Sequence, residues 1–114
     1  MLTAAQFLAK KKRSKYGAKR AKRNDITFHS KREAAYYDKL VNDQKEGKIS
    51  FFLMQVPFRL PGNIKYLLDF MVIKETLGLC QIVYIDVKGF MTPLSKMKIA
   101  QVEELYKIRI EIVK

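Results

Sequence analysis

The sequence of 114 residues has one cysteine, one histidine and no tryptophan. The single cysteine, Cys80, cannot form an internal disulfide or supply a zinc site alone, which favours a reducing, intracellular setting. We expect Cys80 to be a buried, inert thiol. The opening apolar stretch, residues 1–9, is shorter than a signal-peptide core or a membrane span, and its positive charge follows it. We therefore expect a cytoplasmic protein without a membrane partner.

Acidic residues are scarce: 11 Asp and Glu face 23 Lys and Arg, which leaves a net charge of +12. Residues 1–23 contain nine basic side chains and no acid. Such an excess of positive charge favours a polyanionic partner, and nucleic acid is the default one. We expect phosphate contacts from these nine residues, although a charge run can also serve solubility alone. They are Lys10, Lys11, Lys12, Arg13, Lys15, Lys19, Arg20, Lys22 and Arg23.

Apolar residues make up 48% of the chain, which is enough for one core but leaves little room for a second domain. We expect a basic N-terminal arm over residues 1–23 and one domain over residues 24–114. Within residues 1–23 a short helix can begin near Thr3, and Asn24-Asp25 is a turn signal between two short runs.

Four kinds of local pattern predict the elements of the domain. Ser30 and Glu33 have the spacing of a capping box, which predicts a helix over residues 30–46. Residues 51–60 read as a buried strand, and residues 64–74 and 79–88 as two more strands of an antiparallel meander. Thr92 and Pro93 open a second helix that ends near Tyr106. Alternating apolar residues at 108, 110 and 112 predict a last strand with one covered face. The expected fold class is mixed α/β, in the order helix, three strands, helix, strand.

Two acids lie inside strongly apolar strands: Asp69 and Asp86. An ionised carboxylate in such surroundings costs several kcal/mol unless it is paired, hydrogen-bonded or bound to a metal. Lys88 lies two residues after Asp86 and therefore leaves the strand on the same side. Glu33 lies on the same helical face as Tyr37 and could add a third carboxylate.

This set of residues suits phosphodiester hydrolysis. Carboxylates hold a hard divalent cation, the cation polarises the phosphate, and a lysine stabilises the developing negative charge. Oxygen ligands favour magnesium or manganese, and no small-molecule cofactor is implied.

The pattern of Asp69, then Asp86-Val87-Lys88, after a helical glutamate, resembles the PD-(D/E)XK nucleases of the restriction-endonuclease-like superfamily. The order of elements resembles their common core as well. More narrowly, the chain resembles a family of short phage-borne and bacterial proteins related to Holliday-junction-resolving endonucleases. The likeness runs from about Lys15 to the end of the chain. It is carried by residues 15–16, 28–34, 55, 66–70, 86–89, 92 and 96.

The resemblance implies a role for each matching residue. Asp69, Asp86 and the main-chain carbonyl of Val87 would bind the metal, Lys88 would orient the attacking water, and Glu33 would complete the site. Gln55 would be auxiliary, and Lys96 would contact phosphate, although it also fits a solvated helix face. The sequence departs from the superfamily pattern at Leu68, where the proline would stand.

The implied function is a magnesium-dependent endonuclease for branched DNA, such as four-way junctions, in the cytoplasm of a bacterium or a phage-infected host. Symmetric cutting of a junction needs two active sites, so we expect a homodimer. Two alternatives stay open. One is a non-catalytic DNA-binding or adaptor protein, in which the acids pair with basic side chains. The other is a general nicking nuclease that uses the same residues.

Overall fold

The computed structural model describes residues 21–114 of the chain. The chain divides into two compact units, Met1–Lys39 and Leu40–Lys114. Helix α2 (Lys31–Lys45) contributes to both. The helix predicted near Thr3 and the basic residues 10–20 lie outside the described residues.

The described part of the first unit contains a small hairpin and the first turns of α2. Strands β1 (Ala21–Arg23) and β2 (Ile26–Phe28) pair antiparallel. Asn24 and Asp25 connect them with φ angles of 49° and 64°. Two consecutive positive φ angles are those of a type I′ hairpin turn, in which Asn and Asp are favoured. The turn predicted from this dipeptide is therefore confirmed.

Helix α2 begins and ends where its sequence signals predicted, to within one residue. The Glu33 N–H donates to the Ser30 Oγ at 3.2 Å, which satisfies a backbone donor of the first turn. After the last turn, Gly47 adopts a φ of 78°, a conformation that glycine takes without steric cost. Tyr37 and Leu40 are buried on one face of the helix.

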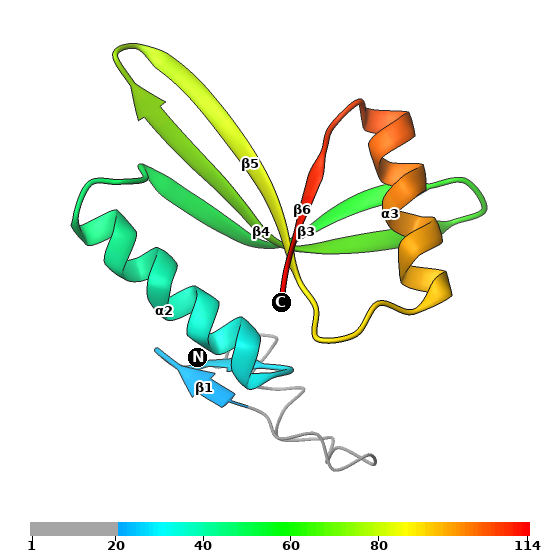
Figure 1. The fold of residues 1–114 in the computed structure, drawn as a ribbon, viewed down its shortest axis with the longest axis horizontal. Helices are drawn as coiled ribbons and strands as arrows, with labels where there is room; N and C mark the ends of the chain where they lie inside the picture. Colours follow the sequence, from blue (N-terminus) through cyan, green and yellow to red (C-terminus); the bar gives the residue numbers. More distant parts are fainter. Residues whose placement is uncertain (1–20) are drawn as a thin grey trace. The chain divides into compact units, whose positions relative to one another are not determined.

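The second unit is built on a mixed four-stranded sheet in the order β3-β4-β5-β6 (Figure 1). Strands β3 (Phe51–Leu60), β4 (Ile64–Thr76) and β5 (Leu79–Val87) form the predicted antiparallel meander. Strand β6 (Ile110–Val113) pairs parallel to β5. Parallel neighbours need a crossover connection, and helix α3 (Pro93–Tyr106) provides it. The expected mixed α/β class is confirmed.

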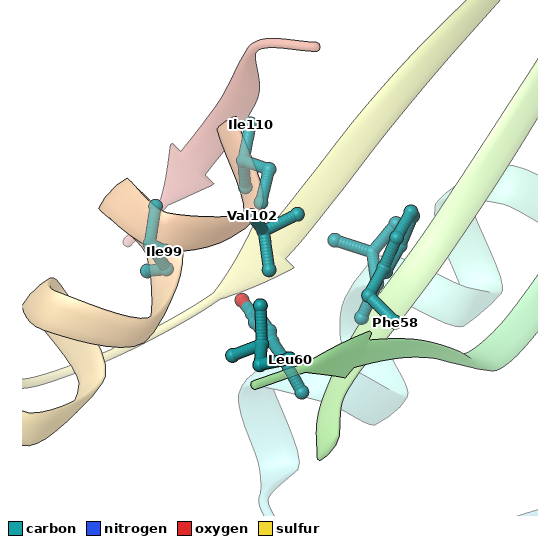
Figure 2. Close-up of a cluster of buried hydrophobic side chains, with 7 residues drawn as sticks. Phe58, Leu60, Ile99, Val102 and Ile110 are labelled. Atoms are coloured by element: carbon teal, nitrogen blue, oxygen red, sulfur yellow. The ribbon is translucent and has the colours of Figure 1, made fainter. Parts of the chain in front are cut away.

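The core of this unit lies between α3 and the sheet. Figure 2 shows Ile99 and Val102 of α3 beside Phe58 and Leu60 of β3 and Ile110 of β6. Tyr66 and Leu68 of β4 complete the cluster. Thr92 caps α3 by accepting from the Ser95 N–H at 3.1 Å, and Pro93 is its first residue, as predicted.

Three predictions of burial are wrong. Strand β3 is exposed at every second residue, because it is an edge strand with a single covered face. Cys80 is exposed, because it lies near the tip of the β4–β5 hairpin, beyond the part of β5 that β6 covers. Ile112 is 38% exposed on the other edge strand, β6.

None of the helices in residues 21–114 is long and apolar enough to cross a membrane.

The cluster predicts a large contrast between two leucines. Leu68 is fully buried, whereas Leu77 in the β4–β5 turn is 98% exposed. Leu68→Ala should lower the free energy of unfolding by about 2–5 kcal/mol, since it leaves a cavity. Leu77→Ala, the same chemical change, should alter it by less than about 0.5 kcal/mol. Urea denaturation of both variants measures the difference, and equal effects would contradict the assigned core.

Candidate functional site

The candidate site lies where the sheet ladder between β4 and β5 ends. The last recorded pair is Phe70 with Ile85, so Asp69 and Asp86 are the next residues on each strand. On the other side of β4, pairs on either side of Asp69 place Gln55 opposite it. Three residues singled out in the sequence, Gln55, Asp69 and Asp86, therefore occupy one row across the sheet.

Asp86 is the only charged residue buried in the described part of the chain, with 2% of its surface exposed. The Tyr66 phenol donates a hydrogen bond to its Oδ2. The Lys88 Nζ lies 3.3 Å from the same oxygen, and the Lys88 side chain is 25% exposed. A buried carboxylate needs such partners, because burial without them disfavours the charged form. The lysine thus connects a buried acid to the surface.

Asp69 is held by the backbone of the neighbouring strand. Its Oδ2 accepts a hydrogen bond from the Val87 N–H at 2.9 Å. The Asp69 side chain thus accepts the hydrogen bond of a β5 N–H group just beyond the end of the β4–β5 ladder. The Lys88 N–H still donates to the Val113 carbonyl at 2.8 Å, so the backbone carrying Lys88 is fixed by β6. The Asp86-Val87-Lys88 segment is therefore anchored from both sides.

Tyr66 is protonated over an unusually wide pH range. Its burial, its hydrogen bond to Asp86 and the negative charges of Asp86 and Asp69 raise the pKa of the phenol well above its ordinary value. Each of these causes disfavours a second negative charge beside the two carboxylates. The phenol therefore acts as a hydrogen-bond donor to Asp86 throughout the physiological range.

The backbone beside Asp69 is irregular. Gln55 adopts a φ of 52°, which costs a non-glycine residue about 1–2 kcal/mol. Leu68 and Met71 both pack in the same core cluster, although residues three apart on a regular strand face opposite sides. Strand β4 therefore departs from the regular alternation of faces between Leu68 and Met71.

The donors present suit one magnesium or manganese ion. Magnesium is commonly bound through one or two carboxylates, with water and substrate phosphate as the other ligands. Asp69 and Asp86 supply two carboxylates from adjacent positions. In residues 21–114 no group of three His, Cys, Asp or Glu side chains is close enough to form an all-protein metal cage. A two-carboxylate site completed by water and substrate phosphate is thus the kind of metal site that these residues could form.

Other residues predicted for the site lie elsewhere in the fold. Glu33 is in the first turn of α2, in the first unit, where its role as a third carboxylate stays a prediction. Lys96 is exposed in the first turn of α3. The structure gives acidic partners to two of the basic residues, Lys22 and Arg23.

These two partners lie within the first unit. The Arg23 Nε contacts the Asp38 Oδ2 at 2.9 Å, and the Lys22 Nζ lies 3.7 Å from the Asp25 Oδ1. Both pairs are exposed and therefore worth little, so a phosphate can replace either carboxylate. The other seven basic residues predicted to bind phosphate lie outside the described residues.

Tyr66 belongs to the site, but no role was predicted for it from the sequence. It precedes Asp69 by three positions in an apolar strand, and a regular strand would place the two on opposite faces. The available signal was its hydroxyl, because a buried tyrosine usually finds a hydrogen-bond partner. The sequence did not indicate which acid would accept that bond.

A profile of the family described as "Protein of unknown function (DUF1064)" matches residues 13–113 of the chain. No curated protein and no solved structure matches it.

The raised pKa of Tyr66 predicts how stability depends on pH. The folded-state pKa lies above the unfolded value of about 10, so its contribution is complete below pH 10 and is lost as the pH rises further. The loss should be about 1.4 kcal/mol per pH unit. Tyr66→Phe should remove this slope, whereas Tyr84→Phe should keep it. Urea unfolding at several pH values above neutrality measures both, and an identical slope in wild type and Tyr66→Phe would refute the assignment.

Proposed function

Because the chain belongs to the DUF1064 family of proteins of unknown function, we propose an activity from the site itself. The protein is a metal-dependent endonuclease of the PD-(D/E)XK type that hydrolyses phosphodiester bonds in DNA. The observation that carries this proposal is the contact of the Lys88 Nζ with the buried Asp86, one strand away from Asp69. Two carboxylates and a lysine at one irregular sheet position are the groups that this chemistry uses.

Each residue then has a defined task. Asp69, Asp86 and the main-chain carbonyl of Val87 would hold the ion. A bound magnesium or manganese ion supplies Lewis acidity toward the phosphate and lowers the pKa of bound water. Lys88 orients the attacking water and stabilises negative charge on the phosphate, and its partial exposure allows it to reach a substrate.

The substrate follows from the charge. A net charge of +12 favours a polyanion, and residues 1–23 contain nine basic side chains and no acid. We propose branched DNA, with four-way junctions as the leading substrate, in a bacterial or phage-infected cytoplasm. The active form is a homodimer, because symmetric cutting of a junction needs two active sites.

A second candidate function is a non-catalytic DNA-binding or adaptor protein. It is favoured by the hydrogen bonds and the ion pair that already satisfy the two acids. Tyr66 and Lys88 contact Asp86, and the Val87 N–H contacts Asp69. A buried ion pair of this kind can be purely structural. This candidate predicts DNA binding without metal-dependent cleavage.

Cleavage assays separate the two candidates. Purified protein should cut a labelled four-way junction with magnesium and leave it intact with chelator. Asp86→Asn and Lys88→Met should each lower the cleavage rate by at least about a hundredfold, since each removes a charge that acts on the transition state. The matched carboxylate-to-amide control, Glu75→Gln, changes an exposed residue of β4 and should cut at the wild-type rate.

Matched duplex and single-stranded DNA complete the assay. Cutting confined to the junction supports a resolving enzyme, and cutting of every substrate supports a general nicking nuclease. Binding of the junction without cleavage at any magnesium concentration would refute the nuclease and leave the adaptor.

A further inference from the structure

Two basic residues face each other near the turn of the β3–β4 hairpin. Arg59 of β3 is the ladder partner of Lys65 of β4. Directly opposite residues on antiparallel strands have Cβ atoms about 4.5–5.5 Å apart, and like charges in this position destabilise the pair. The repulsion between these two charges lowers the stability of the hairpin rather than adding to it.

No acid compensates this pair. Neither Arg59 nor Lys65 takes part in any ion pair recorded for the described part of the chain. Both are exposed, and together with Asn63 they line a hollow that is open to solvent. The hollow therefore combines two uncompensated positive charges with an amide side chain.

The backbone of Arg59 is fixed from the side of the helix. The Arg59 N–H donates to the Tyr106 hydroxyl at 3.1 Å, and that hydroxyl donates to the Arg59 carbonyl at 2.8 Å. Tyr106, the last residue of α3, thus takes the place of a neighbouring strand at this edge. Arg59 extends from an anchored backbone, which lowers the entropic cost of holding a ligand.

The pair lies on the same hairpin as the candidate site. Lys65 and Asp69 are four residues apart on β4, and Arg59 and Gln55 are four apart on β3. Residues separated by an even number on a strand share a face, and four residues span about 13 Å. Tyr66 and Leu68, which alternate with them, face the α3 core. Arg59 and Lys65, which alternate with core residues, therefore lie on the face of the hairpin away from α3, about 13 Å along the strands from Gln55 and Asp69.

We propose that Arg59 and Lys65 bind the phosphate backbone of the DNA next to the position that is cut. Arginine donates a fork of N–H groups to phosphate oxygens, and lysine adds a point charge. The separation of about 13 Å corresponds to about four phosphates of one strand, measured along the duplex axis. One strand would run along the hairpin from the basic pair toward Asp69. The inference rests on the proposed function in taking DNA as the ligand and Asp69 as part of the cleavage site.

The test is the salt dependence of binding to a labelled 30-base-pair duplex, with full-length protein and chelator present. Arg59→Gln/Lys65→Gln should flatten the slope of log affinity against log salt by about 1.8, since two phosphate contacts are lost. A slope change of that size corresponds to about thirtyfold weaker binding at about 0.15 M salt. Arg59→Lys should retain most of the wild-type slope.

The matched control is Lys48→Gln/Lys114→Gln, which changes the net charge equally at two exposed positions away from the hollow. It should flatten the slope by much less than the Arg59 and Lys65 variant. The thermal midpoint of Arg59→Gln/Lys65→Gln should not fall below that of the wild type, because the double substitution removes a repulsive pair. Equal effects of the two double variants, an unchanged slope, or no binding of duplex by wild type would each overturn the inference.

The chelator separates this inference from the proposed nuclease activity. Binding that depends on the pair, combined with no cleavage when magnesium is restored, supports the phosphate site and refutes the nuclease. Magnesium-dependent cleavage, combined with a salt slope of binding that is the same in wild type and in the Arg59 and Lys65 variant, supports the nuclease and refutes the phosphate site.

Discussion

The burial of the Asp86 carboxylate is the constraint on which the rest of the site depends. A charge with 2% exposure inside an apolar strand has to be compensated, and the compensating groups are Tyr66 of β4 and Lys88, the residue after β5. Asp69 accepts from the Val87 backbone directly beside it. The end of the β4–β5 ladder and the left-handed φ of Gln55 both occur in this row. Regular strand pairing is thus interrupted where the polar groups come together.

Local signals in the sequence predicted most of the fold. The capping box at Ser30, the Asn24-Asp25 turn and Thr92-Pro93 each act through a few neighbouring residues, so they could be recognised without knowledge of the tertiary structure. Burial could not be predicted in this way. Which faces and strand ends are covered is decided by long-range packing, and Cys80, β3 and Ile112 are exposed for that reason. Apolar composition alone does not distinguish a central strand from an edge strand.

The same division applies to the candidate site. The spacing of Asp86 and Lys88 on one strand predicted their proximity, because alternate residues share a face. The register between strands placed Gln55 and Asp69 in the same row, and that register depends on the exact length of the turn between β3 and β4. Tyr66 was missed because it reaches Asp86 only where β4 departs from regular geometry. Arg59 and Lys65 were missed because they are six positions apart and become neighbours only through the hairpin.

The proposed function requires that Asp69 and Asp86 together hold a divalent cation. The most direct measurement is the anomalous scattering of manganese in crystals of the full chain soaked with the ion, for wild type and Asp86→Asn. The wild-type crystal should show one anomalous peak within ligand distance of both carboxylates, and the Asp86→Asn crystal should lack it. A wild-type crystal in which manganese binds elsewhere while the two carboxylates keep only their protein partners would contradict the proposed function.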